Sequence, residues 1–277
     1  MPGTMRIAFQ GEPGAYSEAA LLAFDPEATP VPCKTFEEVF QAVQEGRAAR
    51  GILPMENSIG GSIHRNYDLL VEHELPIVGE VELKVEHCLM VLPGVRLEDI
   101  QVVHSHPQAL AQCERFLKGM ANVEISAVYD TAGGAKLIRE GGLHTAAAIA
   151  SRRAAEVYAL EVLQEGLQDF DSNITRFFVL SQEETQPSGD DKTSIMFKTL
   201  DKPGALAEVL AEFQKQGVNL THIDKRPAGR VNWTYTFFID AQGHRKDANV
   251  AAAVEKARGH CQELVVLGSY PRSKRIL

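Results

Sequence analysis

The chain lacks the features that mark membrane proteins and nucleic-acid-binding proteins. No uninterrupted apolar run approaches a membrane span, and the N-terminus passes into a strand-like segment without a signal-peptide core. Basic residues are in the minority: 28 Lys and Arg stand against 37 Asp and Glu, so the net charge of −9 gives no general attraction to nucleic acid or anionic lipid. We therefore expect a cytoplasmic protein with no nucleic-acid or membrane partner.

Cysteine is also scarce, which argues against a disulfide framework and a zinc site. The four cysteines lie far apart with no paired spacing, at Cys33, Cys88, Cys113 and Cys261. His104 and His106 would share one face of a strand, but no third ligand is near them in sequence. The glycines of residues 11–14 only loosely resemble a phosphate loop, because Pro13 interrupts them and no Gly-Lys-Ser/Thr follows. We predict neither a metal nor a cofactor.

At 277 residues the chain is long enough for two domains that each bury a core. Strand-like and helical patterns alternate over residues 5–182, which indicates an α/β region. Residues 183–191 are polar, contain Pro and Gly, and are typical of a linker. Residues 192–277 follow a βαββαβ pattern, which predicts a ferredoxin-like domain. Because such a domain leaves strand edges open, we expect it to pair with a copy of itself.

The expected elements of the first region bring small polar residues to several strand ends. A strand over 6–10 precedes a helix over 18–24, for which Ser17 is the expected N-cap. A helix is predicted over 108–118, and another begins at Asp130 or Thr131. The carboxyl ends of strands are where open α/β sheets bind ligands, so these turns are candidate sites.

In the second region the apolar spacing predicts strands over 193–200, 218–226, 231–240 and 263–267, and helices around 205–216 and over 248–258. The strand over 231–240 alternates Trp233, Tyr235, Phe237 and Ile239 on one face.

A hydroxyl and a guanidinium stand together at Thr175-Arg176, where a polar stretch enters the apolar run 177–180. The hydroxyl can donate one hydrogen bond and the guanidinium a planar fork of donors, which suits an oxygen-rich anion. The spacing alone equally fits a Thr and an Arg that cap a strand end. Asn57 likewise fits either a ligand-binding turn or an ordinary one.

The whole chain resembles the monofunctional prephenate dehydratases with a C-terminal ACT domain. The matching motifs are Gly11–Ser17, Pro54–Gly61, Ser105–Gln108 with Gln112-Cys113, and Asp169–Phe177. The resemblance implies a two-lobed catalytic region like the type II periplasmic binding proteins, with the substrate between the lobes. Its two crossover segments are expected near 81–92 and 160–169.

That family removes carbon dioxide and water from prephenate to give phenylpyruvate for phenylalanine biosynthesis, which is carbon–oxygen lyase chemistry. The departing hydroxide needs a donor, an effect worth about 10²–10⁴ in rate. The resemblance makes Thr175 that donor, and the chemistry of the side chains makes Arg176 an anion clamp. The expected orienting donors are Asn57, Ser105 and Gln112, and the expected further substrate contacts are Ser58, Thr131, Tyr16 and Phe177.

The ACT resemblance implies phenylalanine as an effector. The residues expected to bind it are Gly204, Ala205, Leu206, Asn219, Leu220, Asp224, Arg226 and Pro227. The second motif departs from the usual Glu-Ser-Arg-Pro, because Asp224-Lys225 replaces Glu-Ser. A purely structural dimerisation module is the alternative, and we expect a homodimer or homotetramer in either case.

Two other functions fit the sequence. An arogenate dehydratase would act on a substrate that carries an amino acid in place of the keto side chain. A non-catalytic amino-acid-binding sensor would use the same cleft without turnover.

Overall fold

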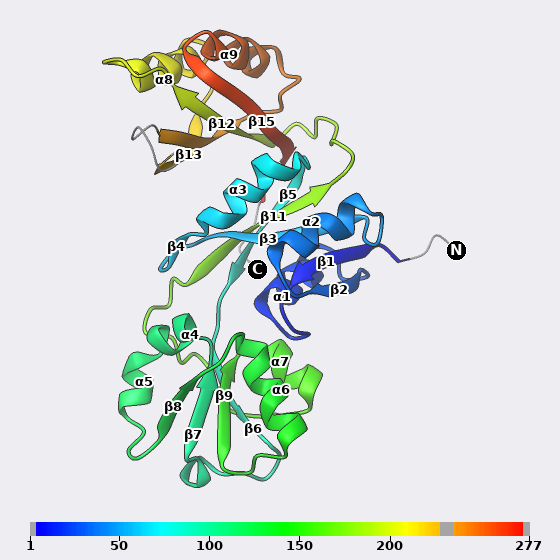
Figure 1. Cartoon of the computed structure of the whole chain (residues 1–277), viewed down its shortest axis with the longest axis vertical. Coiled ribbons are helices and arrows are strands. Elements are labelled where there is room, and N and C mark those ends of the chain that lie inside the picture. Colours follow the sequence, from blue (N-terminus) through cyan, green and yellow to red (C-terminus); the bar gives the residue numbers. More distant parts are fainter. Residues whose placement is uncertain (1–3, 228–234, 274–277) are drawn as a thin grey trace. The chain divides into compact units, whose positions relative to one another are not determined.

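The computed structural model describes residues 4–227 and 235–273 and divides them into two compact units. One unit holds residues 4–63 and 81–177, and the other holds residues 64–80, 178–227 and 235–273. Figure 1 labels the elements of both. The predicted domains, 5–182 and 192–277 with a linker over 183–191, stay a prediction. The division into units follows the packing of the chain and groups residues 64–80 with the C-terminal part, so it does not test those boundaries.

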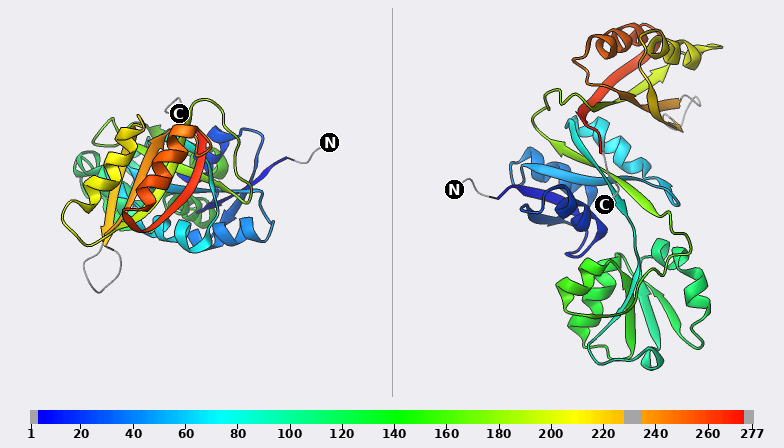
Figure 2. Two further views of the ribbon diagram at one scale, coloured as in Figure 1. Left: turned by 90° about the horizontal axis from the view of Figure 1, so that it is seen from above. Right: turned by 180° about the vertical axis from the view of Figure 1, so that it is seen from behind.

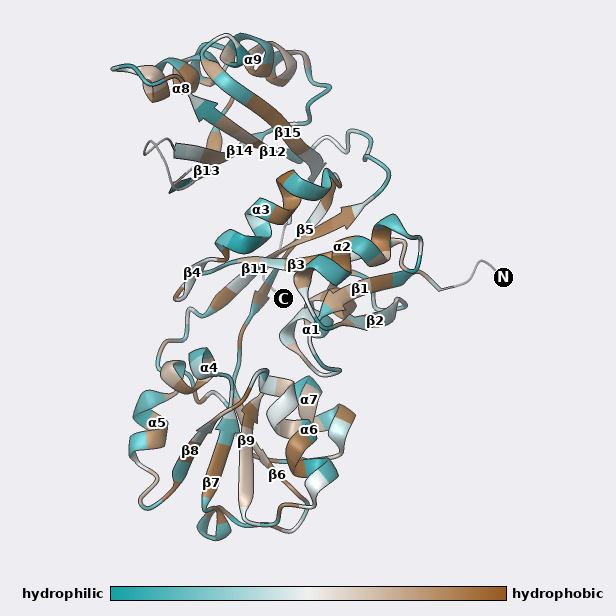
Figure 3. Ribbon diagram, viewed as in Figure 1, coloured by the Kyte–Doolittle hydropathy of each residue, from teal (hydrophilic) through white to brown (hydrophobic). Residues whose placement is uncertain are grey.

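The first sheet has the strand order β2-β1-β3-β11-β5, with β4 paired to β3. Strands β2, β1 and β3 are parallel. The strands are β1 (Arg6–Gln10), β2 (Thr29–Cys33), β3 (Arg50–Asn57), β4 (Gly61–Ser62), β5 (Ile77–Lys84) and β11 (Ile174–Ser181). The helices of this region are α1 (Tyr16–Phe24), α2 (Phe36–Gln44) and α3 (His64–His73). Figure 3 shows apolar and hydrophilic residues on different sides of α2, whose apolar side is buried.

The second sheet forms another lobe of the first unit, with the order β10-β6-β9-β7-β8. Helices α4 and α5 lie on one side of it and α6 and α7 on the other (Figure 1). The strands are β6 (Cys88–Val91), β7 (Val102–Ser105), β8 (Glu124–Ala127), β9 (Ala146–Ala150) and β10 (Glu161–Gln164). The helices are η1 (Leu97–Asp99), α4 (Pro107–Gln112), α5 (Glu114–Lys118), α6 (Thr131–Gly141) and α7 (Arg152–Tyr158).

Two chain segments connect the sheets: residues 85–87 between β5 and β6, and residues 165–173 between β10 and β11. The two segments are hydrogen-bonded to each other, because the Val85 amide donates to the Asn173 carbonyl at 2.8 Å. Contacts between the lobes also fix the loop before α1. Ser151 Oγ donates to the Gly14 carbonyl at 2.6 Å, and Arg153 pairs with the buried Glu18 at 3.2 Å.

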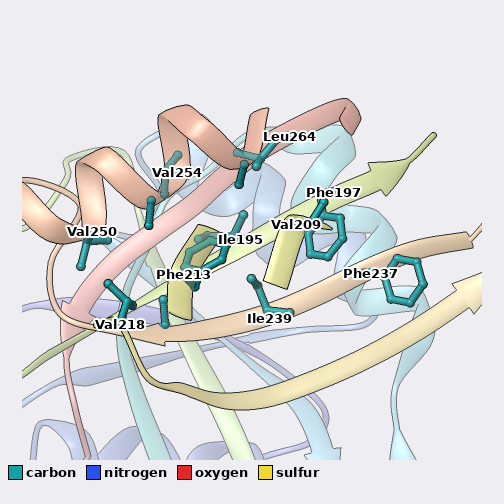
Figure 4. Packing of buried hydrophobic residues seen from close by; sticks show 13 residues of the cluster. Ile195, Phe197, Val209, Phe213, Val218, Phe237, Ile239, Val250, Val254 and Leu264 are labelled. Carbon is teal, nitrogen blue, oxygen red and sulfur yellow. The ribbon is translucent and has the colours of Figure 1, made fainter. Parts of the chain in front are cut away.

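The third sheet, with order β13-β14-β12-β15, belongs to the βαββαβ region. Its elements are β12 (Asp191–Thr199), α8 (Ala205–Lys215), β13 (Leu220–Pro227), β14 (Tyr235–Gln242), α9 (Ala248–Arg258) and β15 (Cys261–Pro271). Figure 2 shows α8 and α9 side by side on one face. Figure 4 shows the core beneath them, where Phe197 stacks on Phe237 at 5.4 Å and Phe213 is fully buried. On the opposite face, Phe238 meets Tyr67 of α3 at 4.6 Å.

The predicted fold class, a two-lobed α/β region with a βαββαβ domain, is confirmed. Some local predictions were wrong. Ser17 does not cap α1, because the helix begins two residues earlier, at Tyr16, with Ala15 at the cap position. The helix predicted over 108–118 is broken at Cys113, whose backbone leaves the helical region. Part of the predicted strand over 231–240, including Trp233, lies outside the described residues.

Candidate active site

A cavity of about 430 Å³ lies between the lobes of the first unit, at the carboxyl ends of strands from both sheets. Its walls contain Gln10 at the end of β1, Asn57 at the end of β3 and His106 just after β7. The carboxyl ends of parallel strands are a common place for ligand sites in α/β folds. The N-terminus of α1 also reaches this cavity, through Tyr16 and Ser17.

Asn57 has a fixed side-chain orientation. Its Oδ1 accepts hydrogen bonds from the backbone amides of Ile59 at 3.1 Å and Gly60 at 2.7 Å. Its Nδ2 therefore points the other way, where it donates to Thr175 Oγ1 at 2.9 Å and to Asn173 Oδ1 at 2.7 Å. Both Asn57 and Thr175 are 8 % exposed, so these bonds are shielded from water.

Gln112 belongs to the same network. Its Oε1 accepts from Asn173 Nδ2 at 2.9 Å and lies 2.8 Å from His87 Nε2. The other ring nitrogen of His87, Nδ1, lies 2.8 Å from the Tyr16 hydroxyl. Burial lowers the pKa of His87, which favours its neutral form. A continuous chain of hydrogen bonds thus runs from Tyr16 to Thr175 along the cavity wall.

The structure brings together six of the residues predicted for the site: Thr175, Asn57, Gln112, Thr131, Tyr16 and Phe177 all line the cavity. Phe177 is buried and lies two residues from Thr175 on β11, so both face the same side of the strand. Thr131 is the first residue of α6, where Asp130 caps the helix through the amides of Ala132 and Gly133.

Three other predicted residues do not line the cavity. Arg176 is buried on β11 between two lining residues, and the alternation of a strand turns it to the opposite face. Ser105 is fully buried, and its Oγ donates to the Ile149 carbonyl at 2.5 Å. Ser58 Oγ donates to the Ser172 carbonyl at 2.6 Å. The roles assigned to these residues stay predictions.

The sequence reasoning missed several lining or linking groups, above all His87 and Asn173. His87 stands alone between two strands, and no sequence signal marked it. Asn173 was part of the polar stretch before Thr175, so its place at a loop entering the core was the available signal. The cavity also contains the Asp130 carboxyl, whose pKa is raised by burial.

A second cavity of about 500 Å³ belongs to the βαββαβ region. Three predicted effector residues line it, namely Gly204, Ala205 and Leu206 at the start of α8. Four other predicted residues lie on or just before β13 and do not line it: Asn219, Leu220, Asp224 and Arg226. Pro227 is the last residue of β13. Lys225, which departs from the usual motif, places its ammonium 5.1 Å from the ring of Tyr235, and Tyr235 lines this cavity.

Fold and site together define a two-lobed α/β protein with a polar interlobe cavity and a ferredoxin-like domain. Sequence comparison matches residues 7–185 to the family described as prephenate dehydratase, and residues 193–259 to the ACT domain. The chain belongs to the prephenate dehydratase family and is a dehydratase, a lyase, with an ACT domain.

Three relatives illustrate the similarity. Arogenate dehydratase/prephenate dehydratase 6, chloroplastic, from Arabidopsis thaliana is 46 % identical over 96 % of this chain and 69 % of the relative. A prephenate dehydratase from Arthrobacter aurescens, solved in complex with L-Phe, is 32 % identical with a TM-score of 0.87, covering 98 % of this chain and 92 % of the relative. A structure described as GqqA, a novel type of quorum quenching acylase, is 35 % identical with a TM-score of 0.89, covering 97 % and 98 %.

Within the described residues, no three His, Cys, Asp or Glu side chains gather as a metal site would require. No described helix is long and apolar enough to cross a membrane. The four cysteines are free, and Cys33, Cys88 and Cys113 are buried.

Proposed function

We propose that the chain converts prephenate to phenylpyruvate, with the Thr175 hydroxyl donating to the ring oxygen that leaves. The observation that carries this proposal is the bond from Asn57 Nδ2 to Thr175 Oγ1. Because the hydroxyl oxygen accepts there, its own proton is available on another side. Thr175 lines the cavity, so a substrate oxygen within it can receive that proton in a hydrogen bond.

The reaction needs little more than this donor. Cleavage of the bond between the ring and its carboxylate releases carbon dioxide and leaves an electron pair in the ring. That pair expels hydroxide from the opposite carbon, the ring becomes aromatic, and the hydroxide is protonated to water. A neutral threonine is a weak acid, so we assign Thr175 a hydrogen bond that strengthens as negative charge grows on the leaving oxygen.

The lining suits a dianion that must lose one carboxylate. Among the described residues, the cavity wall holds no Lys or Arg, and its donors are neutral side chains and the first amides of α1. Those amides have no partner within the helix and lie at the positive end of its dipole. A strong cation on the departing carboxylate would stabilise the ground state more than the transition state, so a lining without Lys or Arg favours decarboxylation.

Thr175→Val and Thr175→Ser test the assignment. Valine keeps the shape and removes the hydroxyl, so kcat on prephenate should fall by about 10²–10⁴ while KM changes much less. Serine keeps the donor and should retain most of the activity. An unchanged kcat in Thr175→Val would remove this residue from the mechanism.

Arogenate is the second candidate substrate, and one feature of the cavity favours it. The Asp130 carboxyl lines the wall, and a carboxylate there would attract the ammonium group that arogenate carries and prephenate lacks. Asp130→Asn keeps an oxygen that can cap α6. If arogenate is the substrate, this change should lower kcat/KM for arogenate more than for prephenate. Equal losses of kcat/KM for arogenate and for prephenate in Asp130→Asn would favour prephenate as the substrate.

An acylase activity is named for one similar structure, and acyl transfer would need an activated nucleophile. Here the bond that the structure gives Thr175 Oγ1 within the cavity comes from an amide, which is not a base. Incubation with an N-acyl amide should therefore release no acid. Release that Thr175→Val abolishes would replace the dehydratase proposal.

We further propose that phenylalanine binds the ACT region and regulates the enzyme, and that the protein is cytoplasmic. The start of α8 supports this, because the first amides of a helix have no partner within it and can receive a carboxylate beside the apolar lining. The Ala205 amide already donates to the Lys202 carbonyl at 3.2 Å. The free, widely spaced cysteines fit a reducing compartment. Assembly as a dimer or tetramer remains part of the same proposal.

A further inference from the structure

His87 is held at four points beside the candidate active site, although it has no place in the proposed chemistry. It lies between β5 and β6, lines the cavity, and is 2 % exposed. Its ring contacts Tyr16 through Nδ1 and Gln112 through Nε2, each at 2.8 Å. Its backbone amide donates to Gln168 Oε1 at 3.0 Å, and its carbonyl accepts from the Leu167 amide at 3.1 Å. The ring orientation is therefore fixed.

The orientation of each amide in the network can be deduced from two backbone N–H groups. The amides of Ile59 and Gly60 can only donate, so the Asn57 atom that they contact is the oxygen. Asn57 Nδ2 then faces Asn173, and its neighbour at 2.7 Å must be the Asn173 oxygen. Asn173 in turn directs its Nδ2 to Gln112, where the contacted atom at 2.9 Å must be Oε1.

The same reasoning fixes the tautomer of His87. Gln112 Oε1 is an acceptor, so His87 Nε2 at 2.8 Å must carry a hydrogen. In the neutral ring Nδ1 is then the acceptor. The Tyr16 hydroxyl lies 2.8 Å from both Nδ1 and the Glu86 carbonyl, so these two acceptors share its one hydrogen. Both contacts of Gln112 use its oxygen. The Gln112 amide nitrogen is thus left for the cavity that this residue lines.

We propose that His87 is a positioning residue for the dehydratase reaction, which orients the Gln112 amide so that its N–H groups, and not its oxygen, face the substrate. This inference rests on the proposed function, since a substrate with two carboxylates is what an inward N–H group would bind. Without the His87 donor only the Asn173 amide holds the Gln112 oxygen, so the Gln112 amide rotates by 180° more readily, and its oxygen would then repel a carboxylate. His87 itself touches no reacting atom.

His87→Gln and His87→Asn form a matched pair that tests the proposal. The glutamine Nε2 occupies the place of the histidine Nε2 and can donate to Gln112, whereas asparagine can replace only Nδ1. We expect His87→Gln to keep kcat/KM within about threefold of the wild type. His87→Asn should lose about tenfold to a hundredfold, mostly as a higher KM, because an orienting donor acts on binding. Equal losses in the two variants would overturn the proposal.

A double-mutant cycle with Gln112→Leu separates positioning from a structural role. If His87 acts through Gln112, adding His87→Asn to Gln112→Leu should lower kcat/KM by less than about twofold more. A full multiplication of the two losses would contradict the proposal, since it would show that His87 acts independently of Gln112.

NMR spectroscopy tests the orientation of the Gln112 amide without turnover. Its result can therefore be told apart from a failure of the proposed function. The side-chain amide NMR signals of Gln112, assigned by their loss in Gln112→Leu, should keep their shifts in His87→Gln and move in His87→Asn. Should the wild type fail to turn over prephenate and arogenate, the dehydratase proposal falls, while these signals still test the orientation. Unmoved signals in His87→Asn would overturn it.

Discussion

Asn57 determines which way the Thr175 hydroxyl can donate. Two backbone amides hold the Asn57 oxygen, so its nitrogen must face Thr175. With its oxygen accepting that bond, the hydroxyl keeps its own hydrogen for the cavity. The chemistry assigned to Thr175 therefore depends on an amide that need not contact the substrate.

Asn57→Asp tests this dependence with almost no change in size. A carboxylate oxygen in place of Nδ2 would accept the Thr175 proton and withdraw it from the substrate. We expect kcat to fall by roughly 10²-fold. As a control, Asn57→Asp should add little to the loss caused by Thr175→Val, because both remove the same donor. Steady-state kinetics that place Asn57→Asp within threefold of the wild type would contradict the account.

The buried ring of His87 should make stability depend on pH. Burial lowers its pKa from 6.5, so below that pH the unfolded chain binds more protons than the folded one. The free energy of unfolding should fall as pH falls through 6.5. Urea unfolding at pH 7, 6 and 5 should show a steeper fall for the wild type than for His87→Gln. Parallel curves would indicate that the ring is not held neutral.

The family resemblance predicted that Thr175, Asn57 and Gln112 belong to one site, and all three line the same cavity. It could not place Arg176, because the alternation of β11 decides which of two adjacent residues faces the cavity. It also gave no role to His87, whose importance comes from partners on α1 and α4 far away in the sequence. Networks of this kind are set by tertiary packing, which local patterns do not encode.

At the scale of elements, the sequence predicted best where local signals agree. The strand over 6–10, the helix over 248–258 and the helix start at Thr131 were all found at their expected places. The helix predicted over 108–118 failed because its middle lies where Cys113 is fully buried and the backbone turns. The adjacent Asp169 amide donates to the Gln112 carbonyl at 2.7 Å, so a partner from another segment replaces the helical bond.

The loop before α1 should tolerate no side chain at Gly14. Its φ of +90° already disfavours other residues, and a Cβ would lie 2.6 Å from the Ala154 Cα of α7. Gly94 is a matched control, because its φ of +85° is similar but the space around it is open. Gly14→Ala should lower the free energy of unfolding by about 1–3 kcal/mol more than Gly94→Ala does.

Chemical denaturation of the two variants measures that difference directly. Equal losses would show that only backbone strain acts at Gly14, and that the loop does not pack closely against α7.

At the scale of the whole molecule, the ACT region shares a compact unit with α3. Arg226 donates to the His64 carbonyl at 2.8 Å and forms an ion pair with Asp68. The buried Glu80 pairs with Lys192 of β12 at 2.8 Å. A ligand at the ACT cavity would therefore bind a domain that contacts segments of the catalytic sequence, and these contacts offer a route by which the two binding free energies could be coupled.

Phenylalanine should stabilise the chain if the ACT cavity binds it. At one hundred times its dissociation constant a ligand adds about 2.7 kcal/mol to the free energy of unfolding, which raises the melting temperature. D-phenylalanine is the matched control, since the same side chain then meets the start of α8 with its carboxylate misplaced. Calorimetry that shows neither heat nor a shift with L-phenylalanine would favour a purely structural ACT domain.

Turnover of prephenate is the most direct test of the central claim, that a hydrogen-bonding cavity with no Lys or Arg among its described lining residues, and with Thr175 as donor, performs a decarboxylating dehydration. The measurement is the ultraviolet absorbance of phenylpyruvate in alkali after incubation of the purified chain with prephenate. The account predicts a signal that grows with time and enzyme concentration and that falls by about 10²–10⁴ in Thr175→Val. The same rate in the wild type, in Thr175→Val and in buffer alone would contradict it.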